Sequence, residues 1–262
     1  MPVNKQPHLS LHLYRRLAIL LAYCLLLLAT NVSRVFASPL NMHIAEGMLP
    51  PLWALFWYAL SLPVWWFGFK RIRKLISEKP EVRLLLGFSG AFVFVLSALK
   101  LPSFSGSSSH PTGTALGTIL FCPLVMAVLG TIVLLFQALL LAHGGITTLG
   151  ANSFSMAIGG PLAAWLTWRA LHKKLPEGAC VFLAALAANL VTYSITSFQL
   201  ALAFPDPAGG ILPSFLKFGS LFVVTQVPLS LSEGFFTMLT YRTLKAVAQD
   251  ELRALGLMEM AP

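Results

Sequence analysis

The chain has 262 residues, of which 57% are hydrophobic and only 10% are charged, and its mean hydropathy is +0.79. Soluble domains carry about 25% charged residues, so this composition excludes an ordinary soluble protein. It indicates an all-α protein that crosses a lipid bilayer several times. The formal net charge of +9 does not indicate a nucleic-acid partner, because the basic residues lie in short stretches between apolar segments, where they orient a membrane protein.

The first 37 residues have the pattern of a secretory signal. Lys5, Arg15 and Arg16 precede an apolar run at 17–29, and small residues follow in the sequence Val35-Phe36-Ala37. The apolar run is shorter than the roughly 20 residues that a membrane helix needs. We therefore expect 1–41 to be a signal peptide or an N-terminal extension, with an uncleaved anchor as the alternative. The chain that follows begins outside the cell.

Basic residues then set the topology of the apolar segments. A first span at 51–69 is followed by six Lys and Arg residues between 70 and 83, which mark a cytoplasmic loop, and a second span at 84–99 returns the chain outward. The remaining apolar stretches lie at 115–142, 150–169, 178–203 and 214–241. Because Arg169, Lys173 and Lys174 are also expected to be cytoplasmic, the stretch at 115–142 must enter the membrane and return.

Proline removes a backbone donor, so we expect the stretch at 115–142 to break near Pro123 into two short helices. Neighbouring helices must then cover their ends, since lipid offers no hydrogen bonds. The sequence thus predicts about seven transmembrane helices in a membrane-embedded domain at 42–248, and a cytoplasmic tail at 249–262. Small residues in the spans, such as Ala184 with Ala188, favour close helix packing within the chain or with another subunit.

No motif of an ATPase or a membrane zinc protease is present in the sequence. It has no Gly-rich phosphate loop followed by Lys-Ser or Lys-Thr and no H-E-x-x-H. The three cysteines, Cys24, Cys122 and Cys180, lie in apolar runs without short-range partners, which predicts neither a disulfide framework nor a cysteine metal site. We therefore do not expect an enzyme.

Polar residues instead gather on the loops predicted to lie outside. They are His43, Glu46, His110, His143 and Asn152, with Thr147 and Thr148 nearby. Imidazole and carboxylate side chains suit the capture of a divalent cation. For His110, in Ser-Ser-Ser-His-Pro-Thr-Gly, the alternative is a histidine in a solvated loop. Glu233 is the one acid well inside a predicted span, so it must pair, be protonated or face a polar cavity.

Five segments carry a resemblance to a known family: MHIAEGMLPP, GAFVFVLSALKLPS, SSSHPTG, LLFQALLLAHGGITTLGAN and QLALAFPDP. From Met42 to about Lys245 the chain resembles the CbiM proteins, the cobalt-recognising membrane subunits of energy-coupling-factor transporters, which are related to the nickel subunits called NikM. The resemblance implies a seven-helix substrate-binding subunit in the plasma membrane that supports cobalamin biosynthesis. It implies Co²⁺ as the transported substrate and no organic cofactor.

The resemblance also implies partners and ligands. The partners are a CbiQ-like transmembrane coupling subunit, CbiO-like ATPase subunits that hydrolyse ATP, and a small CbiN-like accessory subunit. The metal ligands are the α-amine of Met42, the backbone nitrogen and side chain of His43, and the imidazole of His110. Supporting residues around them are expected to be His143, Glu46, Ser109, Thr112 and Asn152.

Two matters stay open in the sequence. The best signal-peptidase site lies after Ala37 and leaves four residues ahead of Met42, so the mature chain begins at Met42, at Ser38 or at Met1. Four nitrogen donors also suit Ni²⁺ at least as well as Co²⁺. The resemblance favours cobalt, because the nickel branch typically has an aspartate where this chain has His143. The alternatives are a nickel subunit and a membrane metal-binding protein without transport.

Overall fold

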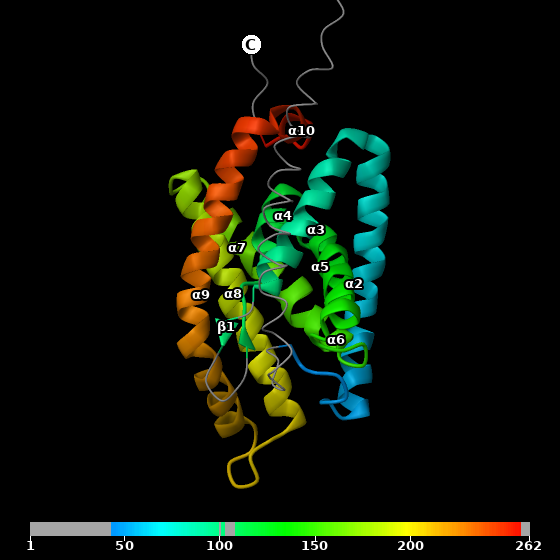
Figure 1. The fold of residues 1–262 in the computed structure, drawn as a ribbon, viewed down its shortest axis with the longest axis vertical. Helices are drawn as coiled ribbons and strands as arrows, with labels where there is room; N and C mark the ends of the chain where they lie inside the picture. Colours follow the sequence, from blue (N-terminus) through cyan, green and yellow to red (C-terminus); the bar gives the residue numbers. More distant parts are fainter. Residues whose placement is uncertain (1–42, 100, 103–107, 258–262) are drawn as a thin grey trace, which may run out of the picture.

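The computed structural model describes residues 43–99, 101–102 and 108–257. Within these ranges five helices are long and apolar enough to cross a membrane, which confirms the all-α, multi-pass membrane architecture (Figure 1). They are α2 (Pro51–Glu78), α3 (Arg83–Ala98) together with the helical turn before it, α5 (Pro123–Leu141), α8 (Glu177–Ala203) and α9 (Ile211–Val247). The predicted signal region and Met42 lie outside the described residues.

The apolar stretch at 115–142 breaks near Pro123 as predicted, but only its first part is short. Helix α4 (Thr114–Leu120) is separated by two residues from α5, which begins at Pro123 and is long enough to cross a membrane. All seven residues of α4 are buried, so its ends are covered by neighbouring helices rather than by lipid. At about 1.5 Å per residue α4 is far too short to span a bilayer. The expected count of seven spans therefore remains a prediction.

The predicted span at 150–169 is helical but not uniform. It consists of α6 (Leu149–Asn152), the π-helical segment η4 (Ser153–Gly159) and α7 (Gly160–Leu171). A π-helical turn widens the helix and often lies beside a functional site. No feature of the sequence predicted this segment.

Two helices are longer than predicted. Helix α2 continues through the basic stretch to Glu78, and α9 runs from Ile211 to Val247. The prediction ended each helix at its last apolar residue. A helix satisfies its own backbone hydrogen bonds, however, and can continue into water beyond the apolar layer. A short 3₁₀ helix, η2 (Pro80–Val82), then turns the chain into α3.

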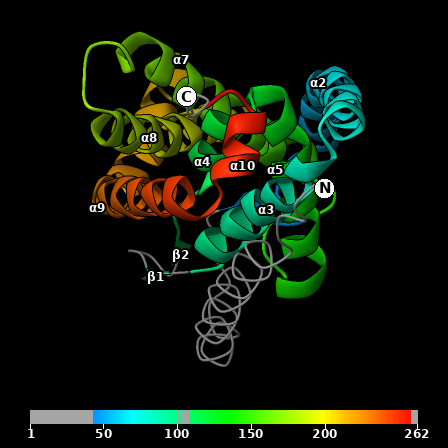
Figure 2. The ribbon, with the colours of Figure 1, turned by 90° about the horizontal axis from the view of Figure 1, so that it is seen from above.

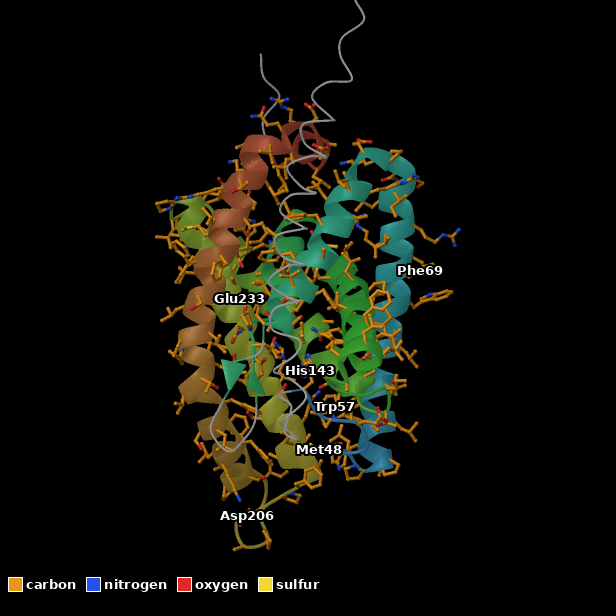
Figure 3. All side chains as sticks on the ribbon, in the orientation of Figure 1. Met48, Trp57, Phe69, His143, Asp206 and Glu233 are labelled. Carbon is orange, nitrogen blue, oxygen red and sulfur yellow. The ribbon has the colours of Figure 1, made fainter. Side chains whose placement is uncertain are left out.

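Helices α8 and α9 form an antiparallel pair that lies side by side in both views (Figures 1 and 2). Their connection closes through backbone hydrogen bonds in both directions between Asp206 and Gly210, each 2.9 Å. The Asp206 carboxylate also accepts hydrogen bonds from the backbone N–H groups of Gly209 and Ala208, which hold the pKa of this carboxyl below its usual range. This turn and Met48 lie at the same end of the bundle (Figure 3).

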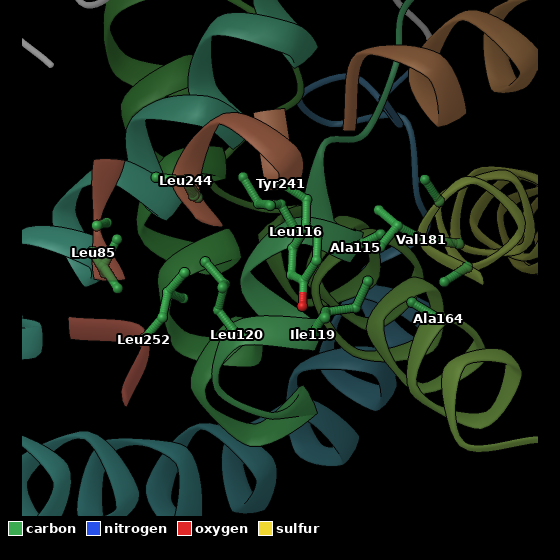
Figure 4. Close-up of a cluster of buried hydrophobic side chains, with 14 residues drawn as sticks. Leu85, Ala115, Leu116, Ile119, Leu120, Ala164, Val181, Tyr241, Leu244 and Leu252 are labelled. Atoms are coloured by element: carbon green, nitrogen blue, oxygen red, sulfur yellow. The ribbon is translucent and has the colours of Figure 1, made fainter. Parts of the chain in front are cut away.

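The opposite end of the bundle is closed by apolar packing. Leu85, Leu116, Tyr241 and Leu252 belong to one buried cluster (Figure 4). Leu252 belongs to α10 (Gln249–Ala254), so the start of the predicted tail is docked on the bundle. The cluster also contains Ala184 and Ala188. These small residues therefore pack against other helices of this chain, which is one of the two roles predicted for them.

Candidate metal centre

Three histidines from separate parts of the sequence converge inside the bundle. His43 precedes α2, His110 lies between the short strand β2 (Ser108–Ser109) and α4, and His143 follows α5. One ring nitrogen of each lies within 4.8 Å of the others, and all three side chains are buried. Figure 3 shows His143 between Glu233 and Met48 along the long axis. The structure thus brings together the three histidines that the sequence predicted to lie on the same side.

The three rings pack directly on one another. The ring centroid of His43 lies 4.6 Å from that of His110 and 4.4 Å from that of His143, and the last two are 5.1 Å apart. Imidazoles at this spacing present several nitrogen atoms to one point. Neutral imidazole is the commonest side-chain ligand for late first-row divalent metals.

Thr148 and Asn152, at the two ends of α6, hold the chain next to His43, and we call this contact the clasp. The side-chain amide of Asn152 accepts a hydrogen bond from the Ile44 N–H at 2.9 Å and donates one to the Ile44 carbonyl at 3.0 Å. The Thr148 hydroxyl donates to the same carbonyl at 2.6 Å. These contacts use the backbone of Ile44 and so fix the position of the residue next to His43.

The clasp continues outward to Glu46, which is exposed. Its carboxylate accepts a hydrogen bond from the Thr147 N–H at 3.2 Å, and the Thr147 hydroxyl accepts one from the Gly47 N–H at 3.0 Å. Gly144 allows the two segments to approach, since a Cβ atom there would lie 3.3 Å from Cβ of His43. Glu46 and Asn152 therefore support the position of the segment that carries His43. Neither residue belongs to the group of side chains that could hold a metal ion.

His110 lies in a loop that is anchored from inside the bundle. Its Nδ1 lies 2.9 Å from the Pro111 carbonyl oxygen, and the Tyr193 hydroxyl donates to the His110 carbonyl at 3.0 Å. The preceding Ser109 hydroxyl donates to that of Thr225 at 2.7 Å. Gly113 then adopts a left-handed conformation with φ 72°, which a residue with a side chain rarely adopts, and α4 begins.

The buried Glu233 of α9 accounts for most of this anchoring. Its carboxylate accepts four hydrogen bonds of 2.7 Å, from the Thr112 N–H, the Thr112 hydroxyl, the Gly113 N–H and the Asn189 side chain. Four donors match a carboxylate, which accepts hydrogen bonds on both oxygens. Of the three options open from the sequence, the structure shows the pairing of Glu233 with polar groups of the loop.

His143 lies where α5 unwinds. Ala142 is the only described non-glycine residue with positive φ, at 45°, and Gly144 has φ 76°. The His143 N–H donates to the Gln137 carbonyl at 3.1 Å and so closes the end of the helix. This abrupt ending turns the His143 ring into the cluster instead of along the helix.

Sequence reasoning missed three polar residues around the centre. His43 Nε2 lies 3.2 Å from Gln137 Oε1, the Gln137 side-chain nitrogen donates to the Ser97 hydroxyl at 2.6 Å, and the Tyr193 hydroxyl lies 3.5 Å from both His110 ring nitrogens. The signal that drew attention to Glu233 also applies to Gln137. A polar side chain in the apolar run of a membrane helix needs a partner.

Comparison with known proteins assigns the chain to a family. A family model described as the cobalt uptake substrate-specific transmembrane region, CbiM, matches residues 43–251. The chain belongs to the CbiM family. The match begins at His43 and covers the three histidine-bearing segments, the Asn152 clasp and Glu233.

Relatives within the CbiM family share most of the chain. The cobalt transport protein CbiM of Roseiflexus sp. (strain RS-1) is 62% identical over 220 residues, which are 84% of this chain and 88% of that relative. The protein of the same name in Streptomyces coelicolor is 57% identical and covers 83% of this chain and 94% of its own length. A crystal structure of a truncated transition metal transporter has a TM-score of 0.68 at 24% identity, covering 78% of this chain and 98% of that one; this likeness supports the fold alone.

Proposed function

We propose that this CbiM-family chain is the substrate-binding subunit of an energy-coupling-factor importer and that it captures Co²⁺ at the outer face of the plasma membrane. The observation that carries the proposal is the convergence of three buried histidines, with ring nitrogens within 4.8 Å of one another, within the matched region. Nitrogen donors suit late first-row divalent ions. The relatives named as cobalt transport proteins support cobalt as the ion.

The proposed ligands are the α-amine of Met42, the backbone nitrogen and imidazole of His43, and the imidazole of His110. An amine and an amide nitrogen from adjacent residues close chelate rings with the same ion, so the N-terminus must lie in the site. Because Met42 directly precedes His43, a mature chain that begins at Met42 brings its amine to the centre. The His143 ring lies against both ligand rings and orients them in this proposal.

The length of the mature chain is a direct test of the amine ligand. Purified, metal-binding protein should have the intact mass of a chain that begins at Met42. An amine displaced by the four residues after Ala37 cannot close the chelate ring through His43. Normal Co²⁺ binding by protein that begins at Ser38 or Met1 would exclude the amine from the site.

Transport itself requires partners in this proposal, because the sequence has no phosphate-binding loop. A CbiQ-like coupling subunit, CbiO-like ATPase subunits and a CbiN-like accessory subunit would supply the energy and complete an importer that supports cobalamin biosynthesis. Nickel remains the second candidate, since nitrogen ligands bind Ni²⁺ more tightly than Co²⁺ in general. Uptake by cells that carry the full set of subunits, with both ions present at equal concentration, is the test. We expect Co²⁺ to accumulate in preference, and preferential accumulation of Ni²⁺ would assign the chain to nickel.

The outward orientation of the centre is proposed from the distribution of charge. Lys and Arg residues crowd the end of α2 and the turn into α3, whereas the turn at Asp206 lies at the end of the bundle that Met48 shares. A single cysteine at exposed Ala208 of a chain without Cys24, Cys122 and Cys180 should react with an impermeant thiol reagent in intact cells. A cysteine at exposed Ser77 should not, and its labelling would reverse the orientation.

A further inference from the structure

A line of buried hydrogen bonds runs from α3 through α5 to His43. The Ser97 hydroxyl donates to the Val93 carbonyl, the Gln137 side-chain nitrogen donates to the Ser97 oxygen at 2.6 Å, and Gln137 Oε1 lies 3.2 Å from His43 Nε2. Ser97 and Gln137 have no exposed surface, and His43 is only 5% exposed. Water therefore does not compete for these groups, and each must find its partner within the protein.

The direction of the hydrogen bonds in this line follows from the single hydrogen of a serine hydroxyl. That hydrogen goes to the Val93 carbonyl, so the Ser97 oxygen is left as an acceptor. The Gln137 amide must then turn its NH₂ group toward Ser97 and its oxygen toward His43. An amide oxygen carries no hydrogen, so the contact with His43 is a hydrogen bond only when Nε2 of that ring carries the proton.

We propose that Gln137 is a positioning residue, which holds His43 in the tautomer protonated at Nε2 and thereby selects Nδ1 as the nitrogen that His43 gives to the metal ion. Only Nδ1 lies close enough to the backbone nitrogen of the same residue to close a chelate ring with it. In the other tautomer the nitrogen free to bind the metal ion is Nε2, which is too far from the backbone nitrogen of His43 to close the chelate ring. The part of this inference that concerns the metal rests on the proposed capture of Co²⁺.

The surroundings of His43 keep the ring in the orientation that this selection needs. Its ring packs against those of His110 and His143, and the Asn152 amide binds both the N–H and the carbonyl of the next residue. A ring held in this way cannot rotate easily to exchange its two nitrogens. Polar partners of metal-binding histidines in other proteins fix the tautomer in the same manner, and their loss costs about 10- to 100-fold in metal affinity.

The test uses the purified full-length mature protein in two states. Without metal, nitrogen-15 NMR of labelled histidine shows which ring nitrogen of His43 carries the proton, a property that a purely structural role of Gln137 would not determine. With Co²⁺ alone as the probe, equilibrium binding gives the affinity. Gln137→Leu removes the acceptor at similar size, whereas Gln137→Glu keeps an acceptor toward Nε2. Thr131→Val removes hydrogen bonds of a hydroxyl on the same helix without touching His43 and is the matched control.

We expect the Nε2-protonated tautomer in the wild type, the Gln137→Glu variant and the control, and a mixture of tautomers in Gln137→Leu. Co²⁺ affinity should fall about 10- to 100-fold in Gln137→Leu and change less in Gln137→Glu. If Gln137→Leu does not fold, Ser97→Ala frees the amide to turn and should shift the tautomer in the same direction. An Nδ1 proton in the wild type, or an unchanged tautomer and affinity in the folded Gln137 and Ser97 variants, would overturn the inference.

The outcomes separate this inference from the proposed function. A wild-type protein that shows the Nε2 proton but binds no Co²⁺ would overturn the metal site and with it the role of Nδ1, while the tautomer assignment would stand. A wild-type protein that binds Co²⁺ tightly with the proton on Nδ1 would keep the proposed function and overturn the role of Gln137.

Discussion

The two segments that carry His43 and His110 are held in opposite ways. The segment at His43 is held by neutral groups, chiefly the buried Asn152 amide, which bind the backbone of Ile44. The loop at His110 is anchored from within by the Glu233 carboxylate, which is completely buried and accepts four hydrogen bonds. Hydrogen bonds to a charged group contribute about 1.5–3 kcal/mol each, whereas those between neutral groups contribute about 0.5–1.5 kcal/mol. We therefore expect the loop at His110 to depend more on Glu233 than the segment at His43 depends on Asn152.

The largest effect is expected from the histidines that the two segments carry. His43→Ala and His110→Ala should each abolish measurable Co²⁺ binding, because each removes a proposed ligand, while the fold should persist because neither residue lies in a helix or in the apolar clusters between the helices. Equilibrium dialysis with Co²⁺ measures the binding, and circular dichroism checks the fold. Wild-type affinity in either variant would remove that residue from the site.

Loss of the Glu233 carboxylate should have the second-largest effect on Co²⁺ affinity. Glu233→Gln places an NH₂ group among four donors, so buried N–H or O–H groups of the loop lose their acceptor at about 1–3 kcal/mol for each. We expect Co²⁺ affinity to fall on the order of 100-fold, since about 1.4 kcal/mol corresponds to a factor of ten, together with a lower melting temperature.

The same change at Glu177 is the matched control for Glu233. Glu177 also lies on a long helix and accepts hydrogen bonds, from Tyr241 and Lys245, but it is partly exposed and its partner Tyr241 belongs to the apolar cluster at the opposite end of the bundle. Glu177→Gln should leave Co²⁺ affinity unchanged. Equal losses in both variants would mean that Glu233 acts through general stability and has no particular effect on the loop.

Loss of the Asn152 side chain should lower Co²⁺ affinity less than loss of the Glu233 carboxylate. Asn152→Leu removes both hydrogen bonds to Ile44 but leaves the Thr148 hydroxyl on the same carbonyl. We expect a fall in Co²⁺ affinity of about 10-fold, the low end of the range for residues that orient ligands. Thr147→Val cuts only the exposed end of the clasp and should change the affinity little. A loss at Asn152 as large as that at Glu233 would contradict the difference between the two segments.

His143 contacts the rings of both His43 and His110, so its replacement affects both segments. His143→Ala should lower Co²⁺ affinity about 10- to 100-fold without abolishing binding, in keeping with a residue that orients the ligand rings. Titration with Co²⁺ at several protein concentrations measures the change. Complete loss of binding would instead make His143 a ligand.

The smallest effect concerns the turn at Asp206, remote from both segments. Its pKa is held below the usual range by backbone N–H groups, so the charged carboxylate stabilises the fold above the pKa of the unfolded chain, about 3.9. This contribution is lost as the pH falls through the lower folded value. Asp206→Asn keeps an oxygen acceptor but does not titrate. Its melting temperature should therefore fall less than that of the wild type below about pH 4, and parallel pH profiles would contradict this.

The sequence predicted what depends on composition and charge. The break before Pro123 followed from the missing donor of proline and from the positions of the basic residues, and the grouping of His43, His110 and His143 followed from the same topology. The π-helical segment η4 and the ends of α2 could not be predicted, because helix geometry there depends on tertiary packing and on water rather than on apolar periodicity.

The details of the site depend on distances that a sequence does not contain. Glu233 was recognisable as a buried acid, but its partners Thr112 and Asn189 lie 121 and 44 residues away in the chain. The link from Gln137 to His43 spans 94 residues. Such partners follow only from the packed bundle, although the rule that a polar residue in a membrane helix needs a partner singles out both Glu233 and Gln137 for inspection.

The central claim is that nitrogen atoms of the two segments bind one metal ion together. Cobalt-edge X-ray absorption of mature protein loaded with one equivalent of Co²⁺ tests it most directly. We predict a first shell of nitrogen or oxygen atoms, with scattering from the imidazoles of His43 and His110, and only the spectrum of unbound Co²⁺ when the His43→Ala protein is treated in the same way. A shell that contains sulfur, or one without imidazole scattering in the wild type, would contradict the claim.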